Sequence, residues 1–105
     1  MAFSNTRGRY ASFGIVTTLS SDMIDLFWEL IDQKLKGAFP LKPVLRFRLL
    51  NRQGKLSVSF SQDSFPMTIT FDYDRQFEHA FPHTVYVVDR NGRETVTLPE
   101  ELHMI

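Results

Sequence analysis

The stretch VLRFRLLNRQGKLSVSF, residues 44–60, alternates apolar and polar side chains on both sides of NRQG, residues 51–54. Such alternation is typical of half-buried strands, and NRQG has the composition of a turn. With NRQG as a four-residue turn, Leu50 faces Lys55. The apolar pairs are then Leu49–Leu56, Phe47–Val58 and Leu45–Phe60. A slip by one residue would mix the apolar and polar sets, so the pattern predicts a hairpin with one core face and one wet face.

Outward from this hairpin, SSDMIDLFWELIDQKLKG, residues 20–37, has apolar residues at helical spacing. Ser20 is a favourable N-cap residue, and Gly37 suits the left-handed position after a helix. MTITFDY, residues 67–73, predicts another strand, and RYASFGIVTTL, residues 9–19, predicts a first strand around Tyr10–Thr17. VYVVDRNGRETVTL, residues 85–98, predicts a hairpin. A two-residue turn sets Arg90 against Arg93 and is preferred on packing grounds, while a bulged three-residue turn would pair Asp89 with Arg93.

The predicted order is one strand, one helix and five further strands, which indicates a single α+β domain over residues 1–105. We expect a mostly antiparallel meander sheet of five to six strands with the main helix packed on one face. The ends, residues 1–9 and 99–105, are expected to be loose. One helix covers one face at best, so the other face should be open. The residues expected on it are Arg46, Arg48, Ser57, Ser59, Thr68, Thr70, Tyr86 and Val88.

Composition excludes several classes of protein. The chain has 105 residues and no cysteine, which removes thiol catalysis, disulfides and cysteine zinc sites. No apolar run has the length of a membrane helix, and the first residues lack the apolar core of a signal peptide, so we expect a cytoplasmic protein without a cofactor. Twelve basic residues balance twelve acidic ones, which is not the strongly basic balance typical of nucleic-acid-binding domains.

Basic residues nevertheless gather around the central hairpin, since no acid occurs between Asp32 and Asp63. This patch consists of Lys42, Arg46, Arg48, Arg52 and Lys55, and Arg7 and Arg9 would extend it as a flexible arm. One interpretation is a solvated sheet face on which arginines lie over serines. The other is a site for phosphate groups, supported by the interleaved serine hydroxyls.

FDYDRQFEHAFPH, residues 71–83, contains His79, His83 and Asp74, the weak candidates for metal ligands. Two histidines four residues apart ligate a metal when they share a helical turn. Pro82 disfavours helix at the residue before it, so a shared turn is not expected here. We therefore interpret this stretch mainly as a strand end followed by a connection that Phe-Pro terminates, with no metal assigned.

No nucleophile elbow, P-loop or dinucleotide-binding motif occurs in the chain, and no catalytic residue is assigned. The leading hypothesis is a non-enzymatic module that binds a protein, or a second copy of itself, through the open sheet face that includes Tyr86. Nucleic-acid or phosphate binding through the basic residues is the alternative. A metal-dependent enzyme at residues 72–83 is the third hypothesis.

Three stretches together carry a resemblance: NTRGRYASFGIVT (5–17), LKGAFPLKPVL (35–45) and DRNGRETVTLPEE (89–101). With them the chain resembles the small bacterial and bacteriophage family known as domain of unknown function 960, whose members are of about this length. The resemblance implies a cytoplasmic protein of low-GC Gram-positive bacteria or their phages. It supplies no functional residues.

Overall fold

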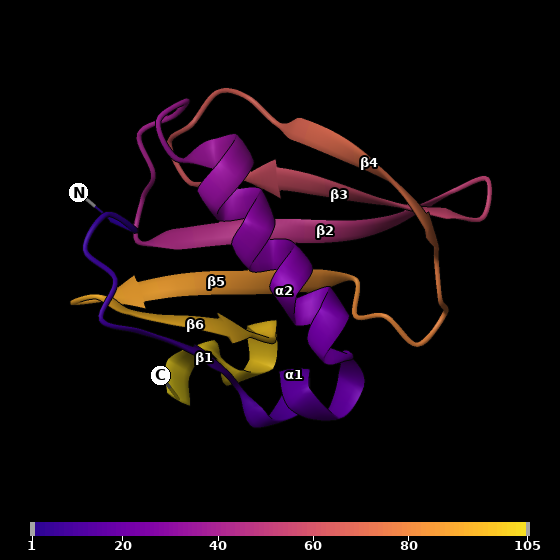
Figure 1. The fold of residues 1–105 in the computed structure, drawn as a ribbon, viewed down its shortest axis with the longest axis horizontal. Helices are drawn as coiled ribbons and strands as arrows, with labels where there is room; N and C mark the ends of the chain where they lie inside the picture. Colours follow the sequence, from indigo (N-terminus) through magenta and orange to yellow (C-terminus); the bar gives the residue numbers. More distant parts are fainter. Residues whose placement is uncertain (1, 105) are drawn as a thin grey trace.

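The computed structural model describes residues 2–104, which form a six-stranded sheet with helix α2 crossing one of its faces (Figure 1). The elements in chain order are β1 (Gly8–Ala11), α1 (Phe13–Thr18), α2 (Ser21–Leu30), η1 (Ile31–Leu35), β2 (Val44–Arg52), β3 (Lys55–Ser61), β4 (Ile69–Gln76), β5 (Thr84–Arg90), β6 (Arg93–Thr97) and η2 (Pro99–Met104). The π-helical turn η1 continues α2, and η2 is a 3-10 helix. Within residues 2–104, no helix is long and apolar enough to cross a membrane.

The predicted α+β class and the mostly antiparallel sheet are confirmed. The strands lie in the order β1-β6-β5-β2-β3-β4, and β1 runs parallel to β6 while the other neighbours are antiparallel. This order departs from a continuous meander between β4 and β5, where the chain crosses from the β4 edge to the far side of β2. The alternating stretch of β2 and β3 therefore lies in the middle of the sheet.

The register of the β2–β3 hairpin differs from the predicted one by two positions, because Leu49 lies opposite Val58 and not opposite Leu56. The turn consists of Gln53 and Gly54 alone, which both have positive φ, 54° and 89°. That conformation is typical of the two-residue turns that match the twist of a hairpin. A shift of two positions leaves every side chain on its predicted face, so the division into an apolar and a polar face survives the error.

The predicted first strand, Tyr10–Thr17, is wrong beyond Ala11, because the chain turns into the short helix α1 at Phe13. Ser12 caps this helix by accepting a hydrogen bond from the Ile15 amide, at 3.3 Å. The β-branched residues that suggested a strand are accommodated because the hydroxyl of Thr18 donates back to the Gly14 carbonyl, at 2.6 Å. Local capping and tertiary contacts thus override the intrinsic β preference.

The predicted helix begins where expected. The hydroxyl of Ser20 accepts a hydrogen bond from the Met23 amide, at 3.3 Å, as an N-cap does. After Leu30 the helix widens into the π-helical turn η1, and Gly37 follows with φ of 82°. The inner face of the sheet, defined here as the face that α2 covers, packs directly on this helix. The rings of Phe27 and Phe47 lie edge to face with their centroids 5.4 Å apart.

The core lies between this helix and the inner face of the sheet. Its buried members include Met23, Phe27, Leu30, Ile31, Leu45, Phe47, Val58, Phe60, Val85, Val87 and Val96. The opposite face, called the outer face below, carries the residues that alternate with these strand positions.

The chain ends that the sequence suggested to be loose include Met1 and Ile105, which lie outside the described residues. Near the start, Phe3 is fully buried, and its amide donates to the Asp89 carboxylate at 2.8 Å. Arg7 donates its backbone N–H to the Gly92 carbonyl at 2.7 Å. Near the end, residues 99–104 form η2, which contacts β5. The described parts of both ends are therefore in contact with the sheet.

Candidate binding surface on the outer face of the sheet

The outer face is polar, but part of the surface expected to be open is covered. Arg48, Thr68 and Thr70 are exposed, while Arg46 and Tyr86 are half-buried. Ser57, Ser59 and Val88 are buried. The two serines are small residues between longer side chains on the neighbouring strands, and the Ser57 hydroxyl donates to Asp72 at 2.5 Å. Long side chains therefore form much of this surface, with small residues beneath them.

Arg46 lies at the centre of the outer face and is held by three groups. It donates to the Tyr86 hydroxyl at 3.4 Å, to Ser61 at 3.2 Å and to the Asp63 carboxylate at 3.0 Å. Its guanidinium also lies 5.8 Å from the centroid of the Tyr86 ring. The hydrogen bond to Tyr86 and the one to Asp63 raise the pKa of Arg46 above its ordinary value. Arg46 is thus a fixed part of the surface, not a mobile charge.

Towards β3 and β4 the outer face is a mixture of charges. Lys55 donates to Asp74 at 2.6 Å, and this contact lowers the pKa of the exposed Asp74 carboxyl. Arg52 approaches Asp72 with 3.5 Å between nitrogen and oxygen. Together with Arg46–Asp63, these ion pairs form what we call the mixed-charge half of the outer face. Exposed ion pairs of this kind contribute little stability.

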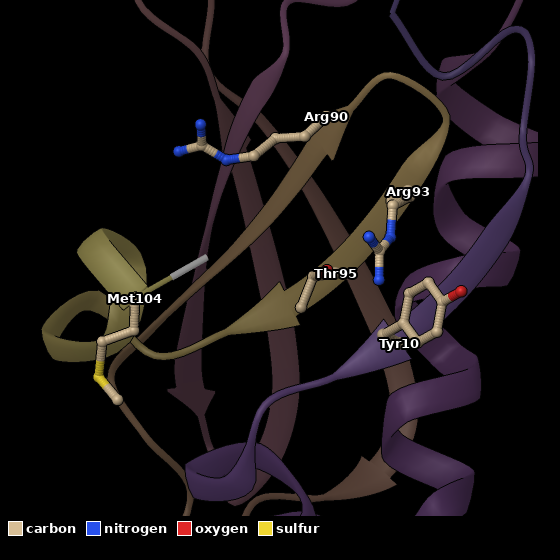
Figure 2. Close-up of a pocket in the computed structure, with 5 residues that line it drawn as sticks. All are labelled: Tyr10, Arg90, Arg93, Thr95 and Met104. Atoms are coloured by element: carbon tan, nitrogen blue, oxygen red, sulfur yellow. The ribbon is translucent and has the colours of Figure 1, made fainter.

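Towards β5 and β6 the outer face is cationic. Arg90 and Arg93 occupy directly opposed positions in the hairpin. They border a hollow of about 400 Å³, the arginine hollow, lined by Tyr10, Arg90, Arg93, Thr95 and Met104. Figure 2 shows Thr95 between two walls, with Tyr10 and Arg93 on one side and Arg90 and Met104 on the other. The guanidinium of Arg93 lies 5.5 Å from the centroid of the Tyr10 ring.

Arg48 is one of the predicted basic residues that stay available. It is exposed and lies between Ser59 and Thr84 in the register of the sheet. Within residues 2–104, no carboxylate forms an ion pair with Arg48, Arg90 or Arg93. Lys42 is exposed in the connection before β2, where its amide donates to Gln62 at 2.8 Å.

The two arginines of the predicted arm lie apart from each other and from this surface. Arg9 donates to Glu94 at 3.1 Å and makes two hydrogen bonds to Asp32. Its guanidinium packs 4.7 Å from the centroid of the Trp28 ring, on the helix side of the molecule. The hydrogen bonds to Asp32 and Glu94 raise the pKa of Arg9 although burial lowers it. Arg7 is exposed beside the Asn91–Gly92 turn.

The histidine-containing stretch brings no ligand set together. His79 is exposed, and its ring lies edge-on to Phe77, which in turn packs on the buried Phe81. His83 lies beside Pro99 and Glu100, and Asp74 is paired with Lys55. Within the part of the chain that the structure describes, no group of three or more histidine or acidic side chains could hold a metal ion.

Local sequence patterns do not identify the arginine hollow as a site. Their one signal is that the predicted hairpin sets two like charges, Arg90 and Arg93, at opposed positions. Tyr10 reaches the same place only because β1 pairs with β6. The two strands are far apart in the sequence, since the paired residues Arg9 and Glu94 are 85 positions apart. Met104 arrives from η2. Neither approach can be read from local patterns.

Comparison with known proteins supports the resemblance drawn from the sequence. A family model described as "Staphylococcal protein of unknown function (DUF960)" matches residues 8–101. The crystal structure of a protein of unknown function from Enterococcus faecalis superposes with a TM-score of 0.89 at 42% sequence identity, over 91% of this chain and 91% of that chain. No curated protein matches the chain.

Proposed function

The chain belongs to the DUF960 family of proteins of unknown function, and we propose that it is a non-enzymatic module that binds an acidic protein through the outer face of its sheet. The observation that carries this proposal is the exposed guanidinium of Arg48 on strand β2, which forms no ion pair with a carboxylate of residues 2–104. A partner with a carboxylate at that position would supply the missing ion pair.

The surroundings of Arg48 favour a protein surface. Tyr86 and Arg46 pair across β5 and β2, two residues along the strands from the Thr84–Arg48 pair. Tyrosine and arginine are residue types enriched at the centres of interfaces. The mixed-charge half beside them offers both donors and acceptors. Such a rim suits a partner that carries charges of both signs, as proteins do.

The absence of a catalytic assignment rests on the side chains that the structure brings together. His79 lies edge-on to the ring of Phe77, and His83 borders a shallow hollow with Pro82, Pro99 and Glu100. The buried hydroxyl of Ser57 donates to Asp72, and no histidine approaches this pair within residues 2–104. These contacts support a binding module over an enzyme.

Site-specific photo-crosslinking in bacterial cells tests this proposal. A photoreactive side chain at Thr84, which pairs with Arg48 across β5 and β2, should give one protease-sensitive adduct with an acidic protein. The same side chain at Lys34, which is exposed on the helix side, is the matched control and should not give that adduct. Arg48→Glu should abolish the Thr84 adduct, whereas Lys34→Glu should leave it in place.

Three outcomes of this experiment would overturn the proposal. An adduct of twice the mass of the chain would indicate self-association. An adduct removed by nuclease would indicate a nucleic acid. An adduct that survives Arg48→Glu would show that the contact does not depend on the unpaired guanidinium.

Nucleic-acid binding is the second candidate, because the structure interleaves aromatic and cationic side chains on one face. Tyr86 lies beside Arg46, and Tyr10 lies beside Arg93. Stacking of bases on such rings, with arginines on the phosphates, is the usual mode of single-strand binding. We rank it second because Asp63, Asp72 and Asp74 interrupt the cations of this face, so an extended phosphate backbone would meet carboxylates along its path. A protein partner needs only one carboxylate placed at Arg48.

A further inference from the structure

We propose that the arginine hollow is a binding site for a phosphate monoester that carries an apolar or aromatic group. The site is separate from the surface around Arg48, and its test does not depend on the protein partner proposed above.

The first argument is the charge of the hollow. Like charges at directly opposed positions of a sheet are destabilising, yet Arg90 and Arg93 face each other across the hairpin. Arg9, Arg46 and Lys55 are paired with carboxylates, whereas no carboxylate of the described residues pairs with Arg90 or Arg93. Figure 2 shows the two guanidiniums directed apart, and an anion bound between them would offset the repulsion that bringing them together costs.

The second argument is the set of polar groups. A guanidinium only donates hydrogen bonds, and the hydroxyl of Thr95 adds one further donor to the lining. A phosphate monoester carries a charge of about −1.5 to −2 near pH 7 and several strong acceptor oxygens. It therefore balances two guanidiniums, whereas one carboxylate balances only one. Arginine is also the residue that contacts phosphate through two parallel hydrogen bonds.

The third argument is the apolar part of the lining. Tyr10 and Met104 are 48% and 71% exposed, which is high for side chains of their size. Figure 2 places them on opposite sides of the hollow, so an apolar or aromatic group bound in it would lie against one or the other of these side chains. The volume of about 400 Å³ lies in the range of roughly 300–1,000 Å³ found for small-molecule sites. A phosphate ion alone would leave these two side chains in water.

Gly8 shapes the wall that Tyr10 forms. A Cβ atom added at Gly8 would lie 2.6 Å from the Tyr10 hydroxyl and 3.0 Å from two of its ring carbons. The ring therefore lies over Gly8, where it also meets the guanidinium of Arg93. Gly8→Ala should displace the ring without changing any charge in the hollow, which separates the role of the wall from that of the arginines.

Titration of the full-length protein by two-dimensional NMR tests the site with three probes at constant ionic strength: inorganic phosphate, adenosine monophosphate and adenosine. We expect adenosine monophosphate to shift the amides of Arg90, Arg93 and Thr95 and to bind at least about tenfold more tightly than phosphate. Adenosine should not bind. Arg90→Gln and Arg93→Gln should each weaken binding by about tenfold or more, as loss of a hydrogen bond to a charged group does.

Lys34→Gln is the matched control, since it removes one exposed positive charge from the helix side of the molecule. The NMR spectrum of each variant also reports whether it is folded, and Arg93→Lys, which keeps the charge, should recover part of the affinity.

Binding that is equally weak in Lys34→Gln, or unchanged in both arginine variants, would overturn the site. Equal affinity for phosphate and adenosine monophosphate, or tight binding retained in Gly8→Ala, would overturn the role of the apolar wall. No response to any probe at millimolar concentration would overturn the proposal as a whole.

Discussion

At the scale of single residues, Glu94 is an acidic side chain that is fully buried in the interior. Its side chain has no exposed surface, and it lies on the inner face of β6. The Thr6 hydroxyl donates to it at 2.5 Å, and Arg9 donates at 3.1 Å. A buried charge is tolerated only when it is paired and hydrogen-bonded, and both conditions are met here. Glu94 thereby ties the residues before β1 to the far end of the chain.

We expect Glu94→Ala to lower the free energy of unfolding by about 2–4 kcal/mol, because Arg9 and Thr6 would lose their partner inside the protein. Asp32→Asn removes a negative charge from the same arginine, but that pair is exposed and should cost less than about 1 kcal/mol. Urea unfolding followed by the fluorescence of Trp28 measures both values. Equal losses in the two variants would show that burial does not set the strength of this network.

Sequence patterns could place Arg9 in a basic arm but could not reveal this network. Its partners Glu94 and Asp32 lie 85 and 23 residues away, and the ring of Trp28 completes the contact. Arg46 was correctly placed on the outer face because strand parity is a local property. Its bonds to Tyr86 and Asp63 depend on strand order, which parity does not determine. Residue identity and face are therefore more predictable than partners.

At the scale of secondary-structure elements, α1 depends on Glu101. The Ser12 hydroxyl donates to this carboxylate at 2.6 Å, and the Gly14 amide donates at 2.9 Å. These two bonds hold the start of α1 against η2, and they lower the pKa of Glu101 below its ordinary value of 4.5. The sequence suggested a strand here because these contacts join segments from opposite ends of the chain.

We expect the attachment of α1 to depend on pH in the acid range. Because the pKa of Glu101 is lowered by folding, its contribution to stability is complete above pH 4.5 and is lost as the pH falls through the folded-state pKa. The amide proton of Gly14, followed by NMR, should shift over that range. Glu101→Gln should abolish this titration and weaken the protection of Gly14 at neutral pH. A Gly14 titration that persists in Glu101→Gln would assign it to another group.

At the scale of the whole molecule, strand order was the property that sequence patterns could not supply. Each hairpin was recognised from alternation and turn residues, and the Asn91–Gly92 turn was confirmed with Arg90 opposite Arg93. Nothing local indicates that β5 pairs with β2, or that β1 joins β6 in parallel. These long-range pairings create the outer face and the arginine hollow. The fold class was therefore predictable, while the composition of the candidate sites was not.

The segment before β1 packs against the hairpin of β5 and β6. Phe3 is fully buried in the core cluster, and Asp89 accepts a hydrogen bond from its amide.

We expect Phe3→Ala to lower the free energy of unfolding by about 3–5 kcal/mol, which is typical of a fully buried phenylalanine. Phe13→Ala is the matched control, because Phe13 is 79% exposed and its loss should change stability by no more than about 0.5 kcal/mol. Thermal and urea unfolding of both variants measures the difference. If Phe3→Ala were as mild as Phe13→Ala, the residues before β1 would not be part of the cooperative fold. A loss of the expected size would show instead that the residues before β1 unfold together with the sheet.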